Sequence, residues 1–211
     1  MDKILCIIPA RMGSSRFPGK PLYEINGVPM IGQVYKRVSK NNLLERVVVA
    51  TCDEEIFDYI ESIGGEAIMT SNCHERASDR CAEALLKLEK KHKKIFDIVV
   101  MVQGDEPMTH PDMITEATLP LINNKEINVT NLLGKIKNIE EFKDRNCIKV
   151  VVDNEMNAMY MSRKPIPDKF DSEFVGKQVC VIPFRRDFLL KYISLKPTSL
   201  EINESIDMLR I

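Results

Sequence analysis

Short apolar runs separated by stretches with helical spacing are the feature that most constrains how this chain can fold. Runs rich in β-branched residues occupy 3–9, 46–51 and 97–103, and the segments 29–40 and 78–92 carry apolar residues at helical spacing. Strands that alternate with helices form parallel sheets whose two faces are both covered. The pattern therefore predicts an α/β fold, with a mostly parallel sheet and helices on both faces.

Capping and turn residues divide the rest of this half of the chain. Asp53 is a plausible N-cap for a helix that runs to residue 63, where Gly64 and Gly65 end it. A short strand is expected at 66–70 and a further helix at 111–122. These elements complete the helical connections that a parallel sheet needs.

The pattern changes after about residue 125. Strand candidates follow one another with little helix between them, at 129–133, 148–152, 159–162 and 179–184. Such a series predicts a small antiparallel extension rather than another crossover unit. Two helices, near 187–193 and 200–210, are expected to finish the chain.

Composition bounds the class of protein. The chain has 211 residues and a net charge of −1, which gives no reason to expect a nucleic acid or a membrane surface as partner. We find neither a long apolar run nor the features of a signal peptide, so a cytoplasmic protein is expected. Six dispersed cysteines without a Cys-x-x-Cys pair, and three scattered histidines, predict reduced thiols and no zinc site.

A basic loop follows the first strand, at 9–22. Small residues let its backbone approach a phosphate closely, while Arg11, Arg16 and Lys20 supply three cations. The loop lacks the Gly-Lys-Ser/Thr ending of a Walker loop and the Gly-x-Gly-x-x-Gly pattern of dinucleotide sites. A phosphate-binding loop is the favoured interpretation, and an ordinary solvated basic loop is the alternative.

The string Gln103-Gly-Asp-Glu-Pro107 follows the strongest strand signal. Ligands of open parallel sheets bind beyond the carboxyl ends of the strands, and Mg²⁺ often takes one or two carboxylates plus phosphate oxygens. Asp105 is thus a candidate metal ligand that faces the basic loop. As an isolated motif, it is equally compatible with a turn residue before Pro107.

A third segment, Ser78-Asp79-Arg80, lies at an expected helix start. Ser78 as N-cap and Asp79 in the first turn would be ordinary capping. A cation near a helix N-terminus is electrostatically unfavourable, so Arg80 hints at a ligand or a buried partner.

Together these segments resemble the 3-deoxy-manno-octulosonate (Kdo) cytidylyltransferases, relatives of the CMP-sialate synthetases. The likeness spans nearly the whole chain in order, and the basic loop combined with Gln-Gly-Asp-Glu-Pro is its most specific part. Further matching pieces are Gly27–Ile31, Val49–Thr51 with Asp53-Glu54, Gly64–Glu66, Met69–Ser71, Ile148–Val151 and Tyr160–Arg163 with Ile166-Pro167.

The resemblance implies a Rossmann-like nucleotidyltransferase fold that uses CTP and Mg²⁺ to activate an acidic sugar for surface polysaccharide synthesis. It implies catalytic roles for Arg11, Lys20 and Asp105, with Asp105 on the metal. The implied nucleotide-binding residues are Ala10, Arg11, Ser14, Arg16, Lys20, Ser78, Asp79, Arg80 and Gln103. The implied acceptor-binding positions are Gln103, Lys149, Arg163, Gln178, Ile182 and Asp207.

Two departures from the family pattern alter the expectation. Gln178 and Ile182 stand where the family's sugar-contacting strand carries His and Tyr. The family's Leu-Glu-Gln-Leu-Arg stretch is Ile-Asp-Met-Leu-Arg here, with Asp207 as its second residue. A changed acceptor is therefore expected rather than unmodified Kdo. The chain also stops at Ile211, before the family's second metal-binding aspartate, so the metal is expected on Asp105 and phosphate oxygens unless a further segment exists.

One nucleotidyltransferase domain is expected over 1–211. It divides into a CTP-binding core at 1–124, an antiparallel extension for sugar binding and homodimerisation at 125–185, and C-terminal helices at 186–211. An open antiparallel edge in a small lobe favours a homodimer. Two alternatives stay open: CTP transfer to a non-sugar acid such as a phosphonate, and a degenerate paralogue that only binds a nucleotide.

Overall fold

The computed structural model describes residues 2–13, 17–170 and 175–211, which form two compact units. The first comprises Met1–Thr130 with Cys180–Ile193, and the second comprises Asn131–Val179 with Ser194–Ile211. The chain therefore leaves the first unit after Thr130 and returns to it at Cys180.

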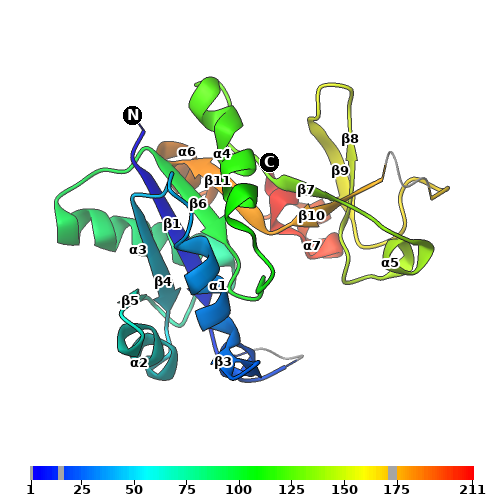
Figure 1. Cartoon of the computed structure of the whole chain (residues 1–211). Coiled ribbons are helices and arrows are strands. Elements are labelled where there is room, and N and C mark those ends of the chain that lie inside the picture. Colours follow the sequence, from blue (N-terminus) through cyan, green and yellow to red (C-terminus); the bar gives the residue numbers. More distant parts are fainter. Residues whose placement is uncertain (1, 14–16, 171–174) are drawn as a thin grey trace. The chain divides into compact units, whose positions relative to one another are not determined.

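A five-stranded sheet forms the centre of the first unit (Figure 1). Its order is β11-β6-β1-β4-β5, with parallel pairing throughout except for the antiparallel edge strand β11. The expected mainly parallel sheet is thus confirmed. Its strands are β1 (Ile4–Ala10), β4 (Arg46–Thr51), β5 (Glu66–Met69), β6 (Ile98–Val102) and β11 (Val181–Arg185).

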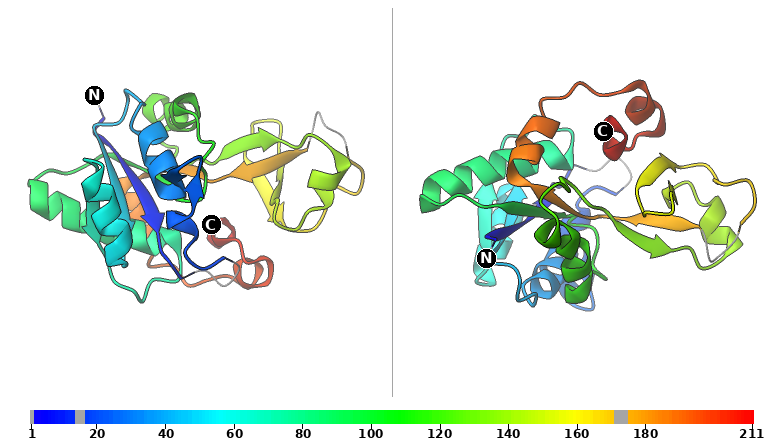
Figure 2. Two further views of the ribbon diagram at one scale, coloured as in Figure 1. Left: turned by 60° about the horizontal axis from the view of Figure 1, so that its bottom comes forward. Right: turned by 90° about the horizontal axis from the view of Figure 1, so that it is seen from above.

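Helices cover both faces of this sheet, as expected (Figure 2). One face carries α1, α2 and α4, and the other carries α3 and α6. Their bounds are α1 Met30–Val38, α2 Glu54–Ser62, α3 Ala77–His92, α4 Pro111–Asn123 and α6 Arg186–Tyr192. The loop after β1 contains the short 3-10 helix η1 (Lys20–Leu22) and leads into the hairpin of β2 (Glu24–Ile25) and β3 (Val28–Pro29).

The core of the first unit is centred on β1 and β6, because both strands lie inside the sheet with covered faces. Every residue of both strands is buried. Their parallel register, together with that of β4, brings the carboxyl ends of β1, β4 and β6 to the same edge. The loops that begin there carry the charged motifs of the sequence.

The second unit is built on an antiparallel sheet in the order β7-β10-β8-β9, which confirms the expected antiparallel strands. These strands are β7 (Leu132–Lys135), β10 (Gly176–Val179), β8 (Lys149–Val152) and β9 (Ala158–Ser162). The unit also contains helices α5 (Ile139–Lys143) and α7 (Ser199–Glu204) and the 3-10 helix η2 (Asp207–Arg210).

Three expected elements were wrong in their extent. The strand expected at 179–184 is two strands, because β10 ends at Val179 and β11 begins at Val181 in a different sheet. The strand expected at 129–133 contributes only a bridge from Val129 to Phe184 before β7 starts. The helix expected at 200–210 is broken at Ser205, which has a left-handed φ of 54°.

A buried ion pair joins α7 to η2. Arg210 donates from Nε and Nη2 to the two carboxylate oxygens of Glu201, at 2.8 and 2.6 Å. Thr198 Oγ1 adds a bond to the Leu209 carbonyl at 2.8 Å. Because both charges are buried, each helps to compensate the other.

We expect Arg210→Ala to destabilise the second unit by about 3–5 kcal/mol, because it removes the cation that faces both oxygens of the buried Glu201 carboxylate. Urea denaturation followed by circular dichroism measures the change. Lys177→Ala is the control, since it breaks the more exposed Lys177–Glu141 pair and should cost about 1 kcal/mol or less. Equal losses for the two variants would contradict the expected role of the buried pair.

Gly104 allows a close approach between the ends of β1 and β6. Its N–H donates to the Pro9 carbonyl at 3.3 Å, and a Cβ at this position would lie 2.9 Å from that oxygen and 3.0 Å from Ile31 Cδ1. We expect Gly104→Ala to cost about 1–3 kcal/mol of unfolding free energy.

Chemical denaturation of Gly104→Ala and of Gly13→Ala tests this expectation. A Cβ added at Gly13 meets nothing within 4 Å among the described residues, so that control should change stability by about 0.5 kcal/mol or less. Unchanged stability of Gly104→Ala would show that the contact is not tight.

Candidate active site

Charged side chains from distant parts of the first unit meet where β1 and β6 end. Lys20 Nζ lies 2.8 Å from Asp105 Oδ2, and both side chains are partly exposed. This pair joins the basic loop after β1 to the Gln-Gly-Asp-Glu-Pro turn after β6, as the sequence predicts. A solvent-facing cation and carboxylate at the carboxyl edge of a parallel sheet can receive a phosphate and a metal.

Asp53 anchors the start of the basic loop. Helix α2 begins at Glu54 with Asp53 at its N-cap position, as expected, but no capping bond from its side chain occurs among the described residues. Its Oδ2 instead accepts the Met12 N–H at 2.8 Å. The expected N-cap position is thus confirmed, but the carboxylate bonds the neighbouring loop rather than the first turn of α2.

Of the three cations of the basic loop, Arg11 and Lys20 belong to the described residues. Arg11 Nη1 lies 3.5 Å from the His74 carbonyl oxygen, a long contact that points its guanidinium toward the segment after β5. The predicted phosphate-binding residues Ser14 and Arg16 lie outside the described residues.

Helix α3 brings an unsatisfied cation to this region. Arg80 is 2% exposed and donates from Nη1 to Thr70 Oγ1 at 2.5 Å and to the Ser71 carbonyl at 3.2 Å. Within the described part of the chain, Arg80 Nη2 and Ser78 Oγ are buried without a hydrogen-bond partner. A missing partner at a buried polar atom is costly, so these two atoms favour a polar partner that the described residues do not supply.

The capping interpretation of Ser78 is wrong. Helix α3 begins at Ala77 with Arg76 at the N-cap, which places Ser78 inside the first turn with 1% of its surface exposed. Asp79 lies in the first turn, as expected.

Two further predicted nucleotide-binding residues occupy strand ends. Ala10 is the last residue of β1 and pairs with Thr51. Gln103 directly follows β6, and its backbone N–H donates to the Cys180 carbonyl at 3.1 Å. Both positions therefore border the edge that carries Lys20 and Asp105.

Lys149, a predicted acceptor-binding residue, is fully buried in the second unit. Its Nζ donates to the carbonyls of Asp144, Cys147 and Arg163 at 2.8, 2.5 and 2.7 Å, which uses all three ammonium hydrogens. Burial lowers the pKa of Lys149. In this arrangement the ammonium tethers three backbone segments and has no donor left for a ligand.

Arg163 is likewise held by backbone oxygens of the second unit. It donates to the carbonyls of Glu204, Arg145 and Ser205 at 2.8, 3.2 and 3.0 Å. The Glu204 carboxylate in turn accepts the Arg163 N–H and the Ser162 hydroxyl, both at 2.9 Å. Burial raises the pKa of Glu204, but these bonds and one from Tyr160 lower it by more. Arg163 therefore fastens β9 to α7.

The other predicted acceptor positions differ in exposure. Gln178 is partly buried and donates to Asn131 Oδ1 at 2.6 Å, and Asp207 begins η2 with a partly exposed side chain. Ile182 is 2% exposed and pairs with Met101 inside the five-stranded sheet of the first unit. A side chain buried in this way packs the core, so the structure does not bring Ile182 to a surface where an acceptor could reach it.

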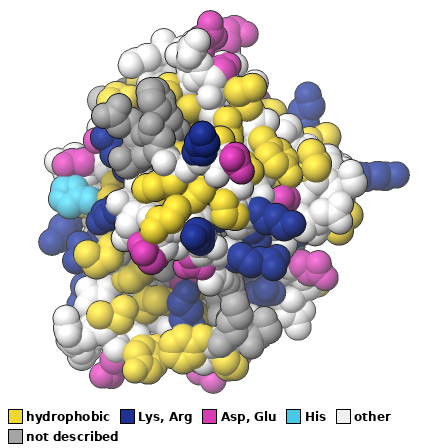
Figure 3. Space-filling view, turned by 90° about the vertical axis from the view of Figure 1, so that its right-hand side faces the viewer, with side chains coloured by type: hydrophobic (Ala, Val, Ile, Leu, Met, Phe, Trp, Pro, Cys, Tyr) yellow, Lys and Arg dark blue, Asp and Glu magenta, His cyan; other side chains and the backbone are white. Residues whose placement is uncertain are grey.

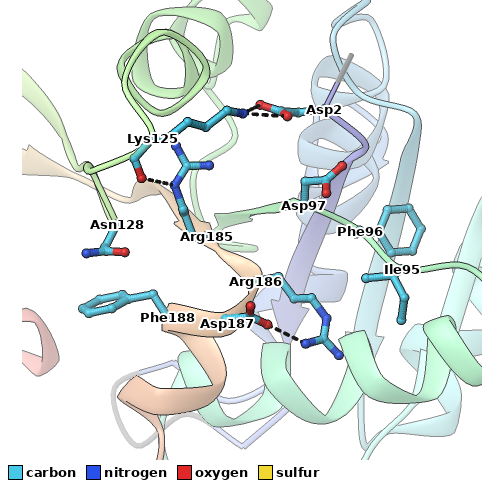
Figure 4. A pocket seen from close by; sticks show the side chains of 10 residues that line it. All are labelled: Asp2, Ile95, Phe96, Asp97, Lys125, Asn128, Arg185, Arg186, Asp187 and Phe188. Carbon is cyan, nitrogen blue, oxygen red and sulfur yellow. Dashed lines mark hydrogen bonds and ion pairs between the residues drawn. The ribbon is translucent and has the colours of Figure 1, made fainter.

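A hollow of about 660 Å³ lies elsewhere on the first unit, near the amino ends of β1 and β6 (Figure 4). It is lined by Asp2, Ile95, Phe96, Asp97, Lys125, Asn128, Arg185, Arg186, Asp187 and Phe188. Its charged side chains already have partners: Lys125 pairs with Asp2, Arg186 with Asp187, Asp97 with the Lys3 N–H, and Arg185 with carbonyls at the end of α4. Ligands of open parallel sheets bind beyond the carboxyl ends of the strands, whereas this hollow lies at their amino ends, so the carboxyl edge is favoured as the active site.

Comparison with known proteins identifies the family. The cytidylyltransferase family matches residues 5–211. The 3-deoxy-manno-octulosonate cytidylyltransferase of Geobacter metallireducens is 42% identical over 222 residues, covering 99% of this chain and 85% of the relative. That of Syntrophus aciditrophicus is 42% identical over 213 residues, covering 100% and 85%.

A solved structure is similar along the whole chain. CMP:2-keto-3-deoxy-manno-octonic acid synthetase in complex with CTP is 38% identical, with a TM-score of 0.88 over 99% of this chain and 84% of that one. This likeness confirms the predicted nucleotidyltransferase fold. The chain therefore belongs to the cytidylyltransferase family, within the group of the 3-deoxy-manno-octulosonate cytidylyltransferases, which are CTP-dependent nucleotidyltransferases.

Proposed function

We propose that this protein transfers the CMP group of CTP to the anomeric hydroxyl of an acidic keto-deoxy sugar of the Kdo type and releases pyrophosphate. The observation that carries the proposal is the Lys20–Asp105 pair at the carboxyl edge of the sheet, in a chain similar throughout its length to a synthetase solved with CTP. A cytoplasmic role in supplying activated sugar for surface polysaccharide fits this chemistry. None of the described helices is long and apolar enough to cross a membrane.

The triphosphate would lie along the basic loop. Arg11 and Lys20 supply cations there, and we assign Arg16 and Ser14 to the same task because they belong to the same loop. Lys20 would exchange its bond to Asp105 for a phosphate oxygen when the nucleotide binds. Such pre-positioned charge supplies most of the stabilisation in transfers of this kind.

The cytosine would meet Ser78 and Arg80, next to Asp79 and the backbone at Ala10. Arg80 Nη2 can only donate, and cytosine offers the acceptors O2 and N3, whereas N3 of uracil carries a hydrogen. Ser78 Oγ can accept from the exocyclic amine of cytosine. The two unpartnered atoms thus support selection of CTP over UTP.

A divalent metal, which we propose is Mg²⁺, fits one carboxylate of this edge. Among the described residues, His, Cys, Asp and Glu form no group of three or more that could hold a metal ion. Mg²⁺ can use one carboxylate together with phosphate oxygens and water, and Asp105 supplies a partly exposed carboxylate. When bound there, the metal would neutralise phosphate charge and polarise the α-phosphate.

For the acceptor we assign Gln103, at the carboxyl edge of the first unit. Lys149 would act by holding the backbone of the second unit, because all three of its ammonium hydrogens are bonded to carbonyls, and Arg163 spends three of its five guanidinium hydrogens in the same way. The replacement of the family His by Gln178 supports an acceptor that differs from Kdo in its hydroxyl groups, whereas Ile182 is buried in the core and gives no such support.

We also propose a homodimer formed through the second unit. Its sheet has open edges at β7 and β9, and Met156 and Met159 expose 65% and 67% of their surface. Hydrophobic side chains reach the surface between charged ones in Figure 3. An exposed antiparallel edge with apolar side chains favours pairing with a second copy.

Pyrophosphate release with CTP, Mg²⁺ and a panel of acids tests the function. We expect release with Kdo-type keto-deoxy sugars, and little with UTP, ATP or GTP in place of CTP. Release only with a phosphonate would favour the non-sugar alternative. Tight CTP binding without turnover on any acid would favour a degenerate paralogue and contradict the proposal.

We expect Asp105→Asn to keep the fold but to lower turnover by about 10²–10³, because it removes one charged group aimed at the reacting phosphates. Melting temperature and Mg²⁺-dependent pyrophosphate release are measured on one preparation. Asp97→Asn is the control, since the Asp97 carboxylate accepts the Lys3 N–H at the amino ends of β1 and β6, away from Asp105, and the change should leave turnover unchanged. Near-normal turnover of Asp105→Asn would remove Asp105 from the mechanism.

A further inference from the structure

Glu83 on α3 gathers three donors on one carboxylate. It accepts the Ser71 N–H at 2.9 Å, lies 2.6 Å from Lys87 Nζ, and bonds His74 Nε2. Ser71 and His74 belong to the segment 71–76, which connects β5 to α3. Glu83 therefore fastens this segment to α3 at two points.

The same segment contacts both arginines assigned to the nucleotide. The Ser71 carbonyl accepts from Arg80 Nη1 at 3.2 Å, and the His74 carbonyl lies 3.5 Å from Arg11 Nη1. The backbone oxygen that receives each arginine thus belongs to a residue that Glu83 holds by another of its atoms. A shift of this segment would move the acceptors that aim Arg80 and Arg11.

We infer that Glu83 is a positioning residue for CTP: by fixing Ser71 and His74, it sets the direction of the Arg80 and Arg11 guanidinium groups. The inference rests on the proposed function, since it assigns Arg80 to the base and Arg11 to the phosphates. Among the described residues, the Glu83 carboxylate bonds Ser71, His74 and Lys87, and it bonds neither Arg80 nor Arg11 directly.

The charge state of Glu83 fits a permanent anchor. Burial raises the pKa of Glu83, but the bonds from Lys87, the Ser71 N–H and His74 outweigh it and hold the pKa at about 2. The carboxylate is therefore ionised at any pH at which the enzyme would work. Lys87 adds a second tie, since its Nζ also donates to the Met69 carbonyl at 2.8 Å at the end of β5.

Two variants of Glu83 are compared with a matched control on the same helix. Glu83→Gln keeps the shape and one acceptor for Ser71, whereas Glu83→Ala removes every bond. The control is Glu89→Gln, because Glu89 also accepts a backbone N–H, that of Phe96 at 3.1 Å, and pairs with a cation, Arg186 at 2.8 Å. Within the described part of the chain, the Glu89 carboxylate bonds Phe96 and Arg186, and it bonds neither the segment 71–76 nor Arg80 or Arg11.

We expect Glu83→Ala to raise the KM for CTP about tenfold, the loss typical of a misdirected charge-assisted bond, with a smaller rise for Glu83→Gln. The preference for CTP over UTP should fall in both variants, because Arg80 no longer points at the base. Glu89→Gln should lower the melting temperature while it leaves the KM and the CTP preference unchanged.

Calorimetric titration with CTP and UTP accompanies the kinetics, so that affinity and base preference are known for each protein independently of turnover. An unchanged CTP affinity and preference in Glu83→Ala would overturn the inference, as would equal changes in Glu89→Gln. If the Glu83 variants do not fold, His74→Ala removes one of the three bonds, and it should shift affinity in the same direction by about threefold. No shift in that variant would overturn the inference as well.

The wild-type protein separates this inference from the proposed function. Absence of CTP-dependent pyrophosphate release in the wild type counts against the function. If the wild type is active and the Glu83 variants keep its CTP affinity and its preference for CTP, only the positioning role of Glu83 is contradicted.

Discussion

Pairing of β1 on both sides is the constraint on which the rest of the first unit depends. β1 is hydrogen-bonded to β4 and to β6 in parallel, and all seven of its residues are buried. Parallel strands in register end at one edge, so the segments that follow β1, β4 and β6 begin beside one another. The basic loop, Asp53 and Asp105 meet for this reason, although they are separated by long stretches of chain.

A position at one edge of the sheet does not by itself fix the direction of a side chain. Specific hydrogen bonds and ion pairs therefore hold the loops that carry these side chains. Asp53 holds the Met12 N–H, Asp105 holds Lys20, and the Gly104 N–H donates to the Pro9 carbonyl. Glu83 performs the same task for the segment that receives Arg80 and Arg11. Such ties lower the reorganisation that a transfer reaction would otherwise require when its substrate binds.

The second unit is stabilised differently, through charged groups bonded to carbonyls and carboxylates inside it. Lys149 binds three carbonyls, Arg163 binds three more, and Glu201 pairs with Arg210. A small antiparallel sheet offers little area for burial, and these bonds join its strands to the final helices α7 and η2. Lys149 and Arg163 thus act first on the backbone of this unit.

The sequence predicts best what depends on local pattern. The apolar runs of β1, β4 and β6, the helices between them and the facing of Asp105 to the basic loop were all predictable, because buried strands are apolar and ligands approach their carboxyl ends. The change of sheet at Cys180 was not, because apolar content does not reveal which neighbour a strand pairs with.

Long-range bonds explain the remaining misses in the site. Asp53 takes the N-cap position that the sequence predicts, but its carboxylate bonds the Met12 N–H, which is 41 residues away and which no local pattern reveals. Lys149 and Arg163 matched family positions, but only the fold shows that carbonyls take all three ammonium hydrogens of Lys149 and three of the five hydrogens of Arg163. Glu83 gave no signal beyond an i,i+4 pair with Lys87, which is common on helix surfaces.

A crystal structure of the protein with CTP and Mg²⁺ tests the central claim most directly. The account predicts cytosine against Arg80 Nη2 and Ser78 Oγ, Lys20 on a phosphate oxygen, and the metal on Asp105. A nucleotide bound away from the carboxyl edge of β1 and β6, or one that leaves Arg80 Nη2 without a partner, would contradict it.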